Sequence, residues 1–121
     1  MMIDESKSDL RHRTKEFALR VIKLYSALPK STEAQVIGKQ ILRSGTSVGA
    51  QYREACRARS NAEFISKMQS ALQELDETSY WLELLADGVI VPAERLLSLR
   101  DETNQLTAIF VSSIKTAKAR K

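Results

Sequence analysis

The sequence contains few of the residues that disulfides, zinc sites and tight turns require. Its 121 residues include four glycines, two prolines, one cysteine and one histidine. With Cys56 alone, the chain can form neither an internal disulfide nor a cysteine-based zinc site, so we expect a reducing, cytoplasmic setting. The scarcity of glycine and proline argues against a β protein, because tight turns between strands depend on these residues.

Long hydrophobic runs are lacking too. No segment approaches the run of about 18 apolar residues that crosses a membrane, and the start, MMIDESKSDLRHR, mixes acids with bases. We therefore expect a protein that is neither secreted nor membrane-spanning. What is present is 28% charged residues with many Ala and Leu, a composition typical of helices. We expect one domain over residues 1–121, long enough to bury about two thirds of its unfolded surface without metals or disulfides.

Apolar residues recur at intervals of three and four along the chain, as they do in helices that pack in bundles. The first series comprises Leu10, Thr14, Phe17, Val21, Leu24 and Leu28, and the last comprises Leu96, Leu99, Thr103, Leu106, Phe110, Ser113 and Ala117. Pro29 ends the first helix, a second runs from about residue 32 to residue 59, Ser60 and Glu63 form a capping box for a third, and Pro92 opens a fourth. Since the connections are short, the sequence predicts an all-α, antiparallel up-down-up-down four-helix bundle.

The second helix carries Gly45, Gly49 and Ala50, and each Gly weakens a helix by about 1 kcal/mol relative to Ala. A helix that contains such residues usually packs closely against another backbone, so we expect a packing surface here. Its apolar side comprises Val36, Ile37, Ile41, Val48, Tyr52, Ala55 and Cys56. A continuous helix and a helix broken at Gly45 both fit this sequence.

The third helix has a core stripe and an aromatic residue outside it. The stripe comprises Phe64, Ile65, Met68, Ala71, Leu72, Leu75, Ser79, Leu82 and Ala86. Gly88 is expected to supply a left-handed residue at the helix end. Trp81 and Leu85 lie to one side of the stripe and are expected to face outward, which leaves YWLELL apolar almost all round. A partner surface explains this, although Trp81 lying flat against a neighbouring helix also fits.

The second and third helices each carry a polar stripe. The stripes are Arg43, Ser47 and Glu54 on one helix, and Lys67, Glu74 and Thr78 on the other. Their opposite charges can pair, within one chain or between subunits, and would then fix the helix register. Two solvated polar faces fit as well, because surface ion pairs stabilise little. The predicted oligomer interface comprises Arg43, Ser47, Glu54, Lys67, Glu74, Trp81 and Leu85.

The net charge of +4 is modest, but the charges are unevenly distributed. Residues 68–94 contain acids and neither Lys nor Arg, while the bases gather at residues 11–15, 53–59 and 115–121. Bases on one face release counterions when they meet phosphate, so these clusters allow nucleic-acid binding that follows charge and shape. A solvated charged face also fits them. The candidate nucleic-acid-binding residues are Arg53, Arg57, Arg59, Lys115, Lys118 and Arg120.

No catalytic motif is visible. A di-iron bundle needs Glu-x-x-His motifs on facing helices, and the one histidine, His12, stands outside any such motif. A Ser-His-Asp site has no strand or nucleophile elbow to sit on. We expect His12 to be solvated, Cys56 to be a small buried hydrophobe, and the protein to be a non-enzyme without metal or cofactor.

The stretches RSGTSVGAQYREACRARSNAEFISK and LQELDETSYWLELL resemble the four-helix-bundle family typified by proteins encoded in intervening sequences of 23S ribosomal RNA genes. That family is also similar to the accessory protein of diversity-generating retroelements. The resemblance implies homopentameric rings and, as in the retroelement member, a reverse-transcriptase partner and nucleic-acid binding through a basic surface. It implies no enzymatic activity. The residues that match the motif are Arg43, Ser44, Ser47, Glu54, Lys67, Glu74 and Trp81, and the sequence departs from it at Gln51 and Ala55.

Together, the residues and the resemblance predict a non-enzymatic homo-oligomer, a pentamer by the resemblance, that binds RNA or a ribonucleoprotein partner through its basic surface. The alternative is a protein–protein scaffold whose basic patches only keep it soluble. Salt dependence separates the two hypotheses, because binding to phosphate weakens steeply with salt and an apolar protein interface does not.

Overall fold

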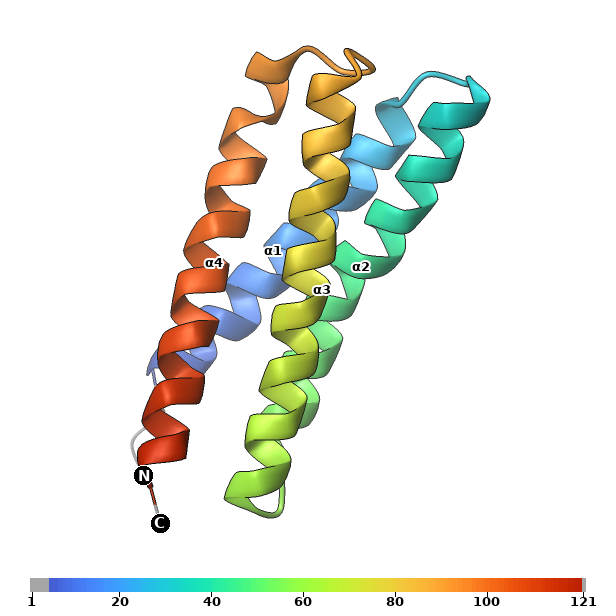
Figure 1. The fold of residues 1–121 in the computed structure, drawn as a ribbon. Coiled ribbons are helices and arrows are strands. Elements are labelled where there is room, and N and C mark those ends of the chain that lie inside the picture. Colours follow the sequence, from blue (N-terminus) through green and yellow to red (C-terminus); the bar gives the residue numbers. More distant parts are fainter. Residues whose placement is uncertain (1–4, 121) are drawn as a thin grey trace.

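The computed structural model describes residues 5–120, with side chains from residue 9 onward, and these residues form four helices. They are α1 (Glu5–Ala27), α2 (Thr32–Cys56), α3 (Asn61–Asp87) and α4 (Ala93–Ala119). Successive helices run up, down, up and down (Figure 1), so the predicted all-α bundle is confirmed. As a result α1 and α3 begin at the same end of the bundle, and α2 and α4 finish there.

The close helix pair predicted from the glycines is α1 with α2. A methyl group added at Gly45 would lie 2.7 Å from a Cγ atom of Val21, and one at Gly49 would lie 3.2 Å from the Thr14 hydroxyl. Such contacts leave no room for a larger residue at Gly45. The glycines therefore serve packing, and α2 continues through Gly45 without a break.

The core follows the predicted heptads closely in α1 and α4. Leu10, Thr14, Phe17, Val21 and Leu28 are buried in α1, while Leu24 is half-buried. In α4 the one difference is at the C-terminal end, where Ile114 is buried in place of Ser113. The spacing of apolar residues was sufficient to orient both helices.

The predicted core stripe of α3 is confirmed at Leu82 but wrong at Ser79, and it omitted two buried residues. Thr78 and Leu85 are fully buried, whereas Ser79 is exposed. The buried residues keep a strict heptad spacing, and the predicted stripe drifted away from it by following the 3.6-residue period of a straight helix. In α2, Val36 was placed on the apolar side but is 57% exposed.

The ends of α3 are capped in different ways. Ser60 accepts a hydrogen bond from the Glu63 amide at 3.0 Å, as predicted, while the Glu63 carboxylate accepts from the Arg59 amide at 3.4 Å. At the other end Gly88 has φ −80°, and the left-handed residue is Val89 with φ 54°. The prediction for Gly88 is therefore wrong by one residue, because the Ile90 amide bonds to the Leu85 carbonyl and places the turn at Val89.

Candidate functional sites

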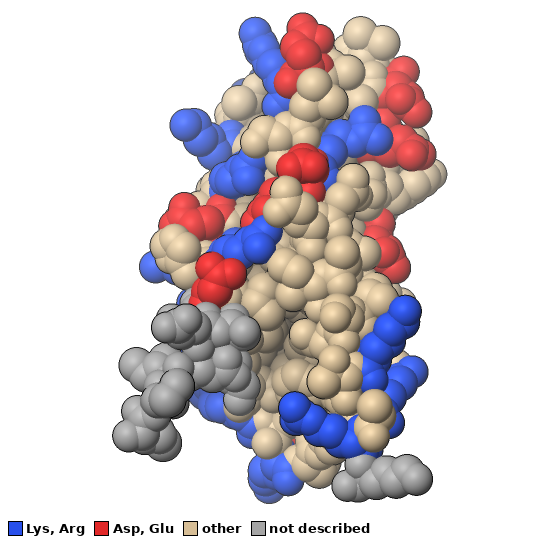
Figure 2. All heavy atoms as spheres, turned by 90° about the vertical axis from the view of Figure 1, so that its left-hand side faces the viewer, with Lys and Arg blue, Asp and Glu red and all other residues tan. Residues whose placement is uncertain are grey.

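The fold gathers the bases of α2 and α4 at one end of the bundle. Arg53, Arg57 and Arg59 lie at the end of α2 and in the following loop, and α4 finishes beside them. The Asn61 side chain joins these parts, since its amide nitrogen donates to the Ala117 carbonyl at 2.8 Å. We call the set the basic end, and it comprises Arg53, Arg57, Arg59, Lys115, Lys118 and Arg120. On the face drawn in Figure 2, charged side chains at the lower end are basic, whereas acidic and basic side chains are mixed higher up.

The side chains of the basic end are available to a ligand. All are exposed except Arg53, which is half-buried. None of them forms an ion pair with another residue of the described chain. Three bases elsewhere, Arg13, Arg43 and Lys67, do form ion pairs. Arg13 bonds Glu102 of α4 at 2.7 Å, and this hydrogen bond raises the pKa of the Arg13 guanidinium. Ion pairs thus neutralise Arg13, Arg43 and Lys67 along the bundle and none of the bases of the basic end.

The polar stripes of α2 and α3 pair within the chain. Arg43 contacts Glu74 at 3.2 Å and Glu77 at 2.6 Å, and Lys67 contacts Glu54 at 2.9 Å. The attraction of Glu74, more than any other cause, raises the pKa of Arg43. Pairing within one chain, one of the alternatives open from the sequence, is therefore the arrangement that the fold adopts.

Two residues of the predicted interface lie further inside than expected. Leu85 is fully buried in the core, so the prediction that it faces outward is wrong. Trp81 is half-buried and packs against the core, with its indole nitrogen enclosed and without an acceptor among the residues described. Ser47 directs its hydroxyl to the Arg43 carbonyl at 2.7 Å, inside its own helix.

An apolar patch lies beside these residues; its part on α3 belongs to the predicted apolar segment YWLELL, whereas Val36 was expected on the buried side of α2. Val36 and Tyr80 are 57% and 51% exposed, and the Tyr80 ring centroid lies 5.1 Å from that of Trp81. Arg43 of α2 faces Glu77 of α3. Because the two helices are antiparallel, Val36, seven residues before Arg43, lies opposite Leu84, seven residues after Glu77. We call Val36, Tyr80, Trp81 and Leu84 the apolar patch. Its signal in the sequence is that Val36 stands two helical turns from Arg43, on the same face.

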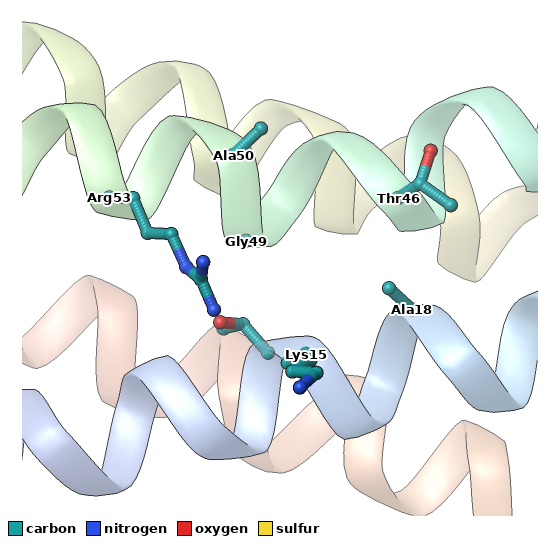
Figure 3. A pocket seen from close by; sticks show the side chains of 7 residues that line it. Lys15, Ala18, Thr46, Gly49, Ala50 and Arg53 are labelled. Atoms are coloured by element: carbon teal, nitrogen blue, oxygen red, sulfur yellow. The ribbon is translucent and has the colours of Figure 1, made fainter.

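A groove of about 400 Å³ runs between α1 and α2. In Figure 3 the Arg53 side chain reaches from α2 across the groove toward α1, which carries Lys15. Between them the walls are short side chains, those of Ala18, Thr46 and Ala50. The sequence placed Lys15 in a basic cluster but could not show that it lies opposite Arg53.

The sequence model of the family described as 23S rRNA-intervening sequence protein matches residues 6–112. The chain belongs to this family. It is also similar to a crystal structure described as a protein with unknown function from the S23 ribosomal protein family of Bacteroides thetaiotaomicron, with 40% sequence identity and a TM-score of 0.84. The likeness covers 90% of this chain and 97% of that one. No functionally curated protein matches the chain.

This member of the 23S rRNA-intervening sequence protein family shows no obvious reaction centre in its described part. No three residues among His, Cys, Asp and Glu gather there in a way that could hold a metal ion. His12 is exposed, and Cys56 is a free thiol that packs half-buried against the core. Within the same residues, every helix is too short or too polar to cross a membrane.

Proposed function

We propose that the protein binds RNA through the basic end, without catalysing a reaction. The observation that carries the proposal is the cluster of six bases without ion pairs at one end of the bundle, beside an α3 that is acidic over most of its length. Unpaired Arg and Lys side chains gather where α2 and α4 finish, whereas residues 68–94, which make up most of α3 and the following loop, contribute only acids to the charged surface. A phosphate backbone is attracted to such an end and repelled from the acidic surface of α3.

Binding of this kind follows charge more than sequence. Stacking on unpaired bases needs exposed aromatic rings. Among the described aromatic side chains, Tyr80 is the one that is mostly exposed, and it belongs to the apolar patch, away from the basic end. Direct contacts to phosphate from Arg and Lys are therefore the main source of affinity in this proposal.

The test is a charge reversal at the basic end, Arg57→Glu with Lys118→Glu and Arg120→Glu. The matched control reverses Lys30, Lys39 and Arg95, exposed bases outside the basic end, and so gives the same net charge. We expect the first variant to lose binding to a labelled single-stranded oligouridine and the control to keep most of it. Equal losses would show that net charge alone is responsible, and unchanged binding in the first variant would remove the basic end from the site.

We also propose that the protein is a homo-oligomer, a ring of five subunits by the family resemblance, and that the apolar patch contributes to the subunit contact. Val36 and Tyr80 are exposed, and the Tyr80 ring packs beside half-buried Trp81. A second subunit would remove this surface from water and gain the hydrophobic free energy of its burial. Several basic ends in one assembly would bind one RNA strand more tightly than a single end.

A further inference from the structure

The groove between α1 and α2 has two cationic walls and contains no carboxylate among its lining residues. Lys15 contributes an ammonium from α1 and Arg53 a guanidinium from α2. Neither side chain forms an ion pair within the part of the chain that the structure describes. An anion that enters the groove therefore meets two unneutralised cations and no opposing charge.

The remaining polar groups of the groove restrict which ligand fits. The hydroxyl of Thr14 donates to the Leu10 carbonyl at 2.7 Å, and that of Thr46 donates to the Leu42 carbonyl at 2.6 Å. Both hydrogens are already engaged within their own helices. The N–H groups of Lys15 and Arg53 are thus the donors offered to a ligand, and they suit a group that only accepts hydrogen bonds, such as a phosphate.

The shape of the groove favours a narrow ligand. Ala18 and Ala50 project only methyl groups, and Gly49 lets α2 approach Thr14 of α1 closely. A volume of about 400 Å³ lies toward the small end of ligand sites in proteins. This space suits a sugar–phosphate unit better than a helix of a protein partner, which is about 10 Å wide with its side chains.

The position of the groove connects it to the basic end. Arg53 belongs to both, and Arg57 follows four residues later, directly after the end of α2. A strand that leaves the groove past Arg53 therefore reaches further bases. We propose that this groove holds the sugar–phosphate backbone of one nucleic-acid strand, with Lys15 and Arg53 on its phosphates. This assignment rests on the proposed RNA-binding function, and it specifies where the bound strand runs across the surface.

The experiment measures affinity for the labelled oligouridine as salt is varied. Each phosphate contact to a single strand contributes about 0.7 to the slope of log affinity against log salt. Lys15→Ala with Arg53→Ala is expected to weaken binding about tenfold and to lower the slope by about 1.4. The matched control is Lys23→Ala with Lys39→Ala, exposed bases on the same two helices outside the groove, which should leave the slope unchanged.

A second variant tests the space without changing charge. Ala50→Leu fills the groove from an exposed position in α2, and Leu is well tolerated in helices. We expect Ala50→Leu to weaken oligouridine binding and to lower the slope of log affinity against log salt, as Lys15→Ala with Arg53→Ala does. If both groove variants bind as tightly as the control, the groove assignment is overturned, whereas RNA binding through the basic end is not contradicted. Failure of the unaltered protein to bind the oligonucleotide would instead overturn the proposed function itself.

Free phosphate is the other source of the same chemistry. Inorganic phosphate is therefore added to the complex, and enough chloride salt is removed to keep the ionic strength constant. The proposal expects phosphate to displace the oligonucleotide no better than chloride does, because a strand makes several contacts at once. Displacement at millimolar phosphate would assign the groove to a small phosphate ligand and overturn its role for nucleic acid.

Discussion

The hydroxyl groups of Ser44 and Thr78 lie 2.7 Å apart in the contact between α2 and α3, where both residues are fully buried. Thr78 also donates to the Glu74 carbonyl of its own helix at 2.8 Å, so it accepts from Ser44. The Arg43 and Lys67 ion pairs, which join the same two helices, lie closer to solvent. The buried pair therefore fixes the register of the two helices from inside.

The Ser44 and Thr78 hydroxyls are expected to be coupled. Ser44→Ala or Thr78→Val should each lower the free energy of unfolding by about 1 kcal/mol, since each leaves a buried partner without its hydrogen bond. The double variant should lose less than the sum of the two, because it removes both polar groups. Urea unfolding measures all three, and strictly additive losses would argue against the coupling.

Gly45 is expected to tolerate Ala poorly. Helix propensity alone would favour Ala by about 1 kcal/mol, but the added methyl would meet the branched, stiff side chain of Val21 at 2.7 Å. Overpacking of this kind costs about 1 to 3 kcal/mol. We expect thermal unfolding to show a net loss for Gly45→Ala and a smaller loss for Gly49→Ala, whose nearest contact is at 3.2 Å. A Gly45→Ala variant more stable than the unaltered protein would contradict the close packing of α1 and α2.

Val89 is a site where stability can be gained. It is a β-branched residue at φ 54°, and its side chain is 81% exposed. Val89→Gly relieves this backbone strain at little cost in burial and should raise the free energy of unfolding by about 1 kcal/mol. Val89→Ala keeps a Cβ atom and should recover much less. If Val89→Gly and Val89→Ala unfold at the same temperature, the left-handed backbone of residue 89 is not a source of strain.

The apolar patch is expected to govern self-association. Val36→Lys with Tyr80→Lys introduces charge at two exposed positions, so it should reduce the mass seen by light scattering while circular dichroism stays unchanged. The control is Leu97→Lys, at a residue that is 63% exposed on α4 outside the patch. Retention of the full assembly by the double variant would place the subunit contact elsewhere, and a monomeric unaltered protein would rule out the proposed oligomer.

Much of the fold followed from spacing, because a heptad repeat determines which side of a helix is buried. Phe17 and Phe110 were placed correctly for that reason. Thr78 and Leu85 were misplaced because a 3.5- and a 3.6-residue period differ little over one turn and separate only over several. The left-handed residue was predicted at Gly88 because glycine adopts that conformation easily. The hydrogen bonds at the end of α3 place it at Val89 instead.

The basic end could be predicted in part, since an up-down-up-down topology brings residues 53–59 and 115–120 to one end whatever the packing details. The groove could not. Lys15 and Arg53 line the same groove only because α1 and α2 pack closely along Gly45 and Gly49, and sequence spacing within one helix says nothing about which residues meet across two. For the same reason, the sequence could not show whether Arg43 pairs with Glu74 within one chain or between subunits.

The most direct test of RNA binding through the basic end is the salt dependence of the unaltered protein's affinity for single-stranded oligouridine. If each side chain of the basic end contacts one phosphate, the slope of log affinity against log salt is about −4, and affinity falls about 300-fold between about 50 and about 200 mM salt. A steep slope near this value is the predicted result. An affinity that stays constant across that range would contradict phosphate recognition and leave the protein–protein scaffold as the better account.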